Sequence, residues 1–66
     1  MGIAKVIEIT SESTKSFEDA IEQGIAGSSK TLHNIRSAWV KEQQVVVQDN
    51  KITAYRVDLK LTFVMD

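Results

Sequence analysis

The sequence predicts a small α+β domain with the element order β-α-β-β, and three observations support this fold class. Residues Ile3 to Thr10 alternate with the two-residue period of a strand, a helical apolar pattern starts at Phe17, and the C-terminal part consists of two strand-like runs separated by Asp49 and Asn50. The 66 residues contain no proline, repeat or low-complexity run, so residues 1–66 are expected to form one domain.

The first strand is expected over Ile3 to Thr10, where β-branched residues recur at alternating positions. The polar residues Ser11 to Ser16 follow and predict a loop. Ser16 with Asp19 three residues later resembles a capping box, with aspartate in place of the usual glutamate, which predicts a helix start near Phe17.

The helix is expected to carry a stripe of residues at helical spacing, several of them small, which permits close packing on a sheet. Gly24 and Gly27 each cost up to about 1 kcal/mol relative to alanine inside a helix, so both are interpreted as points of close backbone approach. His33 and Asn34 are expected to end the helix, because asparagine tolerates the left-handed conformation that closes many helices.

The rest of the chain predicts a long hairpin with Asp49 and Asn50 as its two-residue turn. If Gln48 faces Lys51, the numbers of paired residues sum to 99. The apolar pairs are then Val40 with Leu59 and Ala38 with Leu61, and the polar pairs are Ser37 with Thr62, Trp39 with Lys60, Lys41 with Asp58 and Gln43 with Arg56.

One residue does not fit this register, because Glu42 would face Val57 on the apolar side. A bulge or a sheet edge near Gln43 and Gln44 is therefore expected.

Composition favours self-association and excludes several classes of function. About 60% of the unfolded surface can be buried at this length, and the sequence has no cysteine and a single histidine, His33, with which to reinforce a small core. The net charge is −1 with interspersed signs, which offers no stripe for nucleic acid. No segment has the pattern of a signal peptide or a membrane span, so a cytoplasmic protein without a membrane partner is expected.

The sequence also lacks the motifs of catalysis. It has no cysteine nucleophile, no recognisable local serine–histidine–acid motif and no glycine-rich phosphate loop, so we expect no enzyme activity. The acidic residues do not follow the spacing of a calcium loop and favour a solvated helix face, although a cation bound between subunits stays open. The sequence gives no position for a metal site.

Among the residues of the polar pairs, Trp39 most needs an explanation, because a monomer's polar surface normally carries no large aromatic side chain. It is interpreted as an interface residue, with ligand stacking and partial exposure as alternatives. Arg56, two residues before Asp58, could bind a carboxylate or phosphate, or form an ion pair across an interface. The candidate ligand-binding residues are Ser37, Trp39, Lys41, Arg56 and Asp58.

Four stretches resemble the dodecin family along nearly the whole chain. They are Lys5-Val6-Ile7-Glu8-Ile9, Phe17-Glu18-Asp19-Ala20, Ser29-Lys30-Thr31-Leu32, and the ten residues from Ala54 to Phe63. The resemblance implies a three-stranded antiparallel sheet wrapped over one helix. It also implies a hollow assembly of twelve copies, which in the best-known members holds riboflavin or a related flavin between subunits.

The resemblance also identifies two departures from the flavin-binding members. Their stacking tryptophan at the start of the second strand falls at Ser37 here, and the glutamine that contacts the flavin edge falls at Arg56. A subgroup with arginine at this place and no flavin tryptophan includes calcium-binding dodecins. The leading hypothesis is therefore a non-enzymatic hollow oligomer that binds small ligands or ions without the usual flavin stacking. The alternative is a riboflavin- or FMN-storing dodecin whose rearranged pocket uses Trp39.

Overall fold

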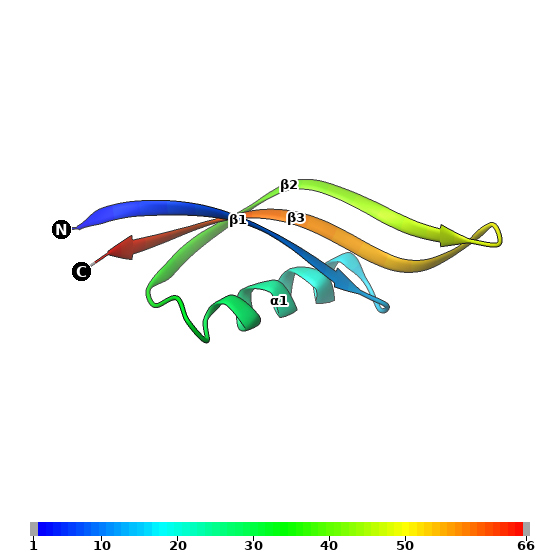
Figure 1. The fold of residues 1–66 in the computed structure, drawn as a ribbon, viewed down its shortest axis with the longest axis horizontal. Coiled ribbons are helices and arrows are strands. Elements are labelled where there is room, and N and C mark those ends of the chain that lie inside the picture. The colour runs from blue at the N-terminus through cyan, green and yellow to red at the C-terminus, as the bar shows by residue number, and fades with distance from the viewer. Residues whose placement is uncertain (1, 66) are drawn as a thin grey trace.

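The computed structural model describes residues 2–65 and confirms the β-α-β-β order (Figure 1). Residues 1 and 66, the two ends of the predicted domain, lie outside the described residues. The three strands form one antiparallel sheet in the order β1-β3-β2, so the last strand lies in the middle. The elements are β1 (Ile3–Ser13), α1 (Phe17–Ser28), β2 (Ile35–Gln48) and β3 (Lys51–Met65).

The core lies between α1 and one face of the sheet. β3 supplies its centre, because Val57, Leu59 and Leu61 project from alternate positions toward the helix and are fully buried. Ala20 of α1 completes the buried cluster, and partly buried apolar residues of β1, α1 and β2 surround it. The side of β3 that faces the helix is therefore the most deeply buried apolar surface of the three strands, as expected for a strand with a neighbour on each edge.

β1 runs to Ser13, so the prediction of a loop from Ser11 to Ser16 is wrong for its first three residues. The physical reason is the partner strand, because Ser11 pairs with Val57 and Ser13 pairs with Tyr55 in the β1–β3 ladder. The Ser13 hydroxyl is buried and donates to Asp19 Oδ2 at 2.6 Å, which joins the end of β1 to the first turn of α1. This hydrogen bond lowers the pKa of Asp19.

The predicted helix start is confirmed. Ser16 is the N-cap in an extended conformation, and its Oγ accepts from the Asp19 N–H at 2.9 Å. The helix nevertheless ends at Ser28, several residues before the predicted end at His33 and Asn34. Residues after Ile25 offer no large apolar side chain until Leu32, so nothing holds a further turn against the sheet.

Asn34 does adopt the left-handed conformation, with φ of 62°, but it precedes β2 and does not close the helix.

The two helical glycines differ. A Cβ at Gly24 would lie 3.0 Å from Ser11 Cβ and 3.2 Å from Leu59 Cδ1, which confirms a close approach. A Cβ at Gly27 would meet nothing within 4 Å, so the same interpretation is wrong there.

The hairpin turn is confirmed. Asp49 and Asn50 have φ of 53° and 62°. Positive φ at both central residues is characteristic of the two-residue turn whose twist matches that of the flanking strands. The predicted register holds next to the turn, where Gln48 pairs with Lys51, and again from Ser37 to Val40, where Val40 pairs with Leu59.

Between these two stretches the register differs from the prediction by one residue. The bulge lies between Val40 and Glu42, earlier than expected, and a second shift between Val46 and Val47 restores the original register. The predicted pairs Lys41 with Asp58, Gln43 with Arg56 and Glu42 with Val57 are therefore wrong. The observed pairs are Glu42 with Asp58, Gln43 with Val57 and Gln44 with Arg56.

The β2–β3 hairpin extends beyond the N-terminal end of α1 and gives the chain an elongated shape of 50 × 19 × 14 Å (Figure 1). Its radius of gyration is 13.5 Å, whereas a compact domain of this length has about 11 Å. Within residues 2–65, no helix is both long and apolar enough to cross a membrane.

Candidate functional site

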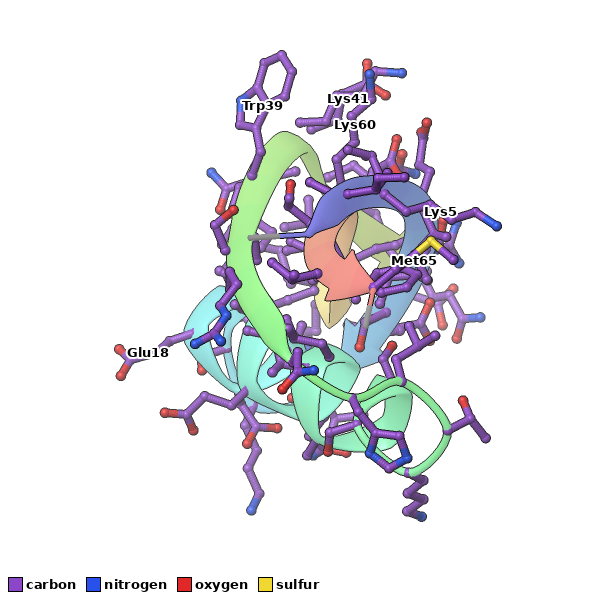
Figure 2. The ribbon with its side chains drawn as sticks, turned by 90° about the vertical axis from the view of Figure 1, so that its left-hand side faces the viewer. Lys5, Glu18, Trp39, Lys41, Lys60 and Met65 are labelled. Atoms are coloured by element: carbon purple, nitrogen blue, oxygen red, sulfur yellow. The ribbon has the colours of Figure 1, made fainter. Side chains whose placement is uncertain are left out.

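The face of the sheet that points away from α1 is called the polar face here. Figure 2 shows Trp39, Lys41 and Lys60 projecting together from this face, opposite the helix that carries Glu18. The register places on it residues from all three strands: Val6, Glu8, Thr10 and Glu12 of β1, Ser37, Trp39, Glu42 and Gln44 of β2, and Arg56, Asp58, Lys60 and Thr62 of β3.

Trp39 is the most prominent side chain of the polar face. It is 64% exposed in the single chain, and Lys60 Nζ lies 5.3 Å from the centroid of its ring. A cation at this distance is attracted to the negative face of the indole, by about 0.5–1 kcal/mol at an exposed site. The predicted pairing of Trp39 with Lys60 is confirmed, and Lys60 covers part of the ring surface.

The bulge places both Lys41 and Glu42 opposite the same region of β3. Glu42 stands opposite Asp58, while Lys41 Nζ reaches Glu8 Oε2 on the far strand at 3.4 Å. Asp58 shares a hydrogen bond with Glu8, which raises the pKa of Asp58 and lowers the pKa of Glu8. Repulsion from Glu42 raises the pKa of Asp58 further, and Lys41 lowers the pKa of both carboxyl groups.

A shallow depression of about 280 Å³ lies beside this carboxyl pair. Its lining consists of Thr10, Glu42, Gln44, Arg56 and Asp58, one or two residues from each strand. All of these groups are polar, which suits a small polar ligand or an ion better than an apolar one.

Arg56 is engaged within its own chain. Its Nε and Nη2 both donate to Glu12 Oε1, at 2.9 Å and 2.7 Å. Both side chains are close to half exposed, at 41% and 47%, so the ion pair contributes little to stability, but it orients the guanidinium along the edge of the depression. The sequence had suggested a ligand or an interface as the partner of Arg56, and within the described chain the partner is Glu12.

The five predicted ligand-binding residues all lie on or next to the polar face, but the structure does not gather them in one place. Arg56 and Asp58 line the depression, whereas Ser37, Trp39 and Lys41 lie outside its lining. Sequence analysis missed Thr10, Glu42 and Gln44 in the lining, and Glu8, Glu12 and Lys60 as partners. Glu8, Thr10 and Glu12 are polar residues at alternate positions of the first strand, and this alternation could have identified the β1 residues of the site.

Comparison with known proteins agrees with this architecture. Residues 3–66 match the model of the dodecin family. The chain is 32% identical over 65 residues to the calcium dodecin of Mycobacterium tuberculosis, covering 98% of this chain and 92% of that protein. A second curated protein, the ribonuclease HII of Listeria monocytogenes, is 33% identical over 55 residues. That match covers 83% of this chain, but the chain spans only 21% of the length of that enzyme.

Solved structures show the same fold. The dodecin from Streptomyces davaonensis superimposes with a TM-score of 0.94 at 31% identity, covering 98% of this chain and 96% of that one. The crystal structure of the M. tuberculosis calcium dodecin, described as a calcium-chelating immunodominant antigen, gives a TM-score of 0.85 at 34% identity over 97% and 91% of the two chains. The three-stranded sheet wrapped over one helix, the match over residues 3–66 and the near-complete coverage of both dodecins together show that this chain belongs to the dodecin family.

Proposed function

We propose that this protein is a non-enzymatic hollow oligomer of twelve subunits that binds small polar ligands or ions at the polar face. The observation that carries the proposal is the depression lined by Thr10, Glu42, Gln44, Arg56 and Asp58, a concave polar surface built by all three strands. Membership of the dodecin family supports the twelve-subunit assembly, and the elongated single chain is consistent with a need for partners.

The residues present do not fit the family's usual flavin stacking. Ser37 is exposed at the place where the flavin-binding members carry their stacking tryptophan, and a hydroxymethyl group offers no aromatic surface. Stacking a base on an aromatic side chain is worth about 1–3 kcal/mol per ring in nucleic-acid complexes, so its loss removes about one to two orders of magnitude of affinity per stacked surface.

Trp39 favours a second candidate, a riboflavin- or FMN-binding pocket that is displaced along the strand. Trp39 lies two residues after Ser37 on the same face, and it is exposed. Lys60 covers part of this ring, so a flavin would have to displace the ammonium group before it could stack on that side. This cost favours the proposal without flavin stacking.

An ion is the other candidate ligand, and the M. tuberculosis relative is a calcium dodecin. Among residues 2–65 of a single chain, no group of three or more acidic, histidine or cysteine residues is arranged to hold a metal. A calcium ion bound by this protein would therefore take oxygen ligands from more than one subunit or complete its shell with water.

Riboflavin and FMN titrations, followed by flavin fluorescence, test the choice between these candidates. We expect weak quenching by the native protein and stronger quenching by Ser37→Trp, which restores an aromatic surface at that position. Trp39→Phe serves as the matched variant, because it keeps an aromatic ring but removes the larger indole. Submicromolar quenching by the native protein that Trp39→Phe weakens would contradict the proposal and support the displaced pocket.

Native mass spectrometry of the purified protein tests the assembly and the ligand together. The expected spectrum shows twelve subunits, with small polar molecules or ions as the retained adducts. Spectra recorded after dialysis with a chelator and after addition of calcium distinguish a bound ion from an organic ligand. A monomer as the main species at micromolar concentration would contradict the proposed assembly.

A further inference from the structure

α1 covers only the middle of one side of the sheet, called the helix-facing side here, and leaves both ends of that side open (Figure 1). The hairpin projects past one end of the helix, and the outer ends of β1 and β3 project past the other. Val47 and Ile52 are exposed in the hairpin, and Ile3 and Met65 are exposed at the opposite end. Each open end of the single chain therefore presents large apolar side chains to solvent.

The exposed apolar residues of the hairpin lie on the helix-facing side. Val45 pairs with Tyr55, whose ring lies against that of Phe17 in α1 with a centroid distance of 5.2 Å. Val47 follows two residues after Val45 on β2 and therefore lies on the same side, and Ile52 stands opposite Val47. Val45, Val47 and Ile52, called the hairpin patch, thus continue the core surface beyond the helix.

Two matched bulges turn the hairpin patch to this side. The β2–β3 register is the same in the core and next to the turn, with seven residues on each strand in between (41–47 and 52–58), so chain length requires no bulge. Lys41 is nevertheless an extra residue in β2, and Thr53 is an extra residue in β3. Without them, strand alternation would place all three residues of the hairpin patch on the polar face.

Each extra residue is held by a contact of its own side chain. Lys41 Nζ lies 3.4 Å from Glu8 Oε2, and the Thr53 hydroxyl donates to the Val46 carbonyl oxygen at 3.2 Å. A bulge leaves one residue out of the ladder, and these contacts offset part of that loss. The fold thus keeps the hairpin patch on the helix-facing side, although a two-stranded ribbon with one apolar side is only marginally stable in water by itself.

The opposite end of the helix-facing side carries a second apolar surface. Ile3 and Met65, called the terminal patch, pair with each other across β1 and β3. Ile3 shares its alternation with Ile7 and Ile9, which pack against the core, so the terminal patch also lies on the helix-facing side. The two patches lie at opposite ends of a chain 50 Å long, so they cannot cover each other within one molecule.

We propose that the hairpin patch of one copy docks on the terminal patch of a second copy in a head-to-tail contact. A contact between two hairpin patches would join only two copies and would leave Ile3 and Met65 exposed. A head-to-tail contact covers both patches and can continue from copy to copy until the assembly closes. The inference rests on the proposed assembly, for which it names the contacting surfaces, and it does not involve the ligand-binding depression.

Lysine substitutions on the two sides of the sheet test this contact. Val47→Lys and Ile3→Lys each place a charge in one patch, where docking would have to desolvate it. Gln48→Lys and Ala4→Lys place the same charge on the adjacent residue, which points to the opposite side of the sheet. Native mass spectrometry should show smaller species for the two patch variants and the native assembly for the two controls. Circular dichroism checks that all four variants are folded.

A mixing experiment separates head-to-tail docking from docking between hairpin patches. Val47→Lys chains keep an intact terminal patch and Ile3→Lys chains keep an intact hairpin patch, so an equimolar mixture should contain species with both variants, identified by their different masses. Docking between hairpin patches would instead leave Ile3→Lys fully assembled by itself, and this result would overturn the inference.

A milder variant keeps the test decisive if Val47→Lys does not fold. Val47→Thr keeps the branched shape but carries a hydroxyl that the docked patch would bury without a partner. The protein concentration needed for half assembly should rise by about tenfold. Equal effects of the patch variants and their controls on an assembled native protein would overturn the contact alone. A monomeric native protein would overturn the proposed assembly together with it.

Discussion

Gly24 shows how one residue sets the distance between α1 and the sheet. A methyl group at this position would lie 3.0 Å from Ser11 Cβ and 3.2 Å from Leu59 Cδ1, closer than side chains normally approach. Leu59 is fully buried in the core, so it has little room to move away. The conformational cost of a glycine inside a helix is therefore offset here by the close packing that its missing side chain permits.

A pair of substitutions separates packing from helix propensity at the two glycines. Gly24→Ala should destabilise the protein, because overpacking of a filled site typically costs about 1–3 kcal/mol and exceeds the gain in propensity. Gly27→Ala should instead stabilise it by up to about 1 kcal/mol, since a Cβ there meets nothing within 4 Å. Chemical denaturation of both variants checks the signs, and a stabilised Gly24→Ala protein would contradict the packing argument.

Single residues also show what sequence reasoning could reach. The N-cap Ser16 was predictable because its hydrogen bond to the Asp19 N–H is local in the sequence. The bond from the Ser13 hydroxyl to Asp19 was not, because it depends on β1 continuing through Ser13 along β3, more than forty residues away in the chain. The same holds for Glu12 and Arg56, whose ion pair requires the β1–β3 register.

The hairpin is the element whose turn the sequence specified most directly. Asp49 and Asn50 both adopt positive φ, and asparagine and aspartate tolerate this conformation better than most residues with a Cβ. Asn50→Ala should cost about 1 kcal/mol of unfolding free energy, because alanine lacks that tolerance, whereas Asn50→Gly should be neutral or stabilising. Urea unfolding measures both, with Lys51→Ala as a control just outside the turn. An equal stability of the alanine and glycine variants would contradict the assigned conformation.

The bulge is the part of this element that the sequence indicated but did not place. The predicted register placed the charged Glu42 on the apolar side of the sheet. In the structure Lys41 is the extra residue of the bulge, and it turns Glu42 toward the polar face. Alternation alone could not fix the position, because Lys41, Glu42, Gln43 and Gln44 are all polar and tolerate either face. Since the site depends on which of them faces β3, the site was harder to predict than the fold.

At the scale of the whole molecule, the single chain has more large apolar side chains on its surface than in its core. Within residues 2–65, five hydrophobic residues are buried, namely Ala20, Ala54, Val57, Leu59 and Leu61. Seven large ones are exposed, namely Ile3, Val6, Trp39, Val45, Val47, Ile52 and Met65. Three of the exposed residues, Val45, Val47 and Ile52, lie toward the turn of the projecting hairpin. Scattered exposed apolar residues are common, but this balance in so small a chain favours contacts with further copies.

The last prediction is that folding and assembly are coupled. If further copies cover the exposed apolar residues, the folded chain is stabilised by mass action, and the midpoint of thermal unfolding should rise with protein concentration. Trp39→Ala should lower both the midpoint and the fraction of assembled protein, because truncation of a central interface tryptophan often costs about 2 kcal/mol or more per contact. Ser37→Ala, on the same strand face but with a small side chain, is the matched control. Light scattering coupled to size-exclusion chromatography reports the assembled fraction. A midpoint that does not change over a hundredfold range of concentration, together with a folded monomer, would show that the chain is stable alone and that Trp39 has another role.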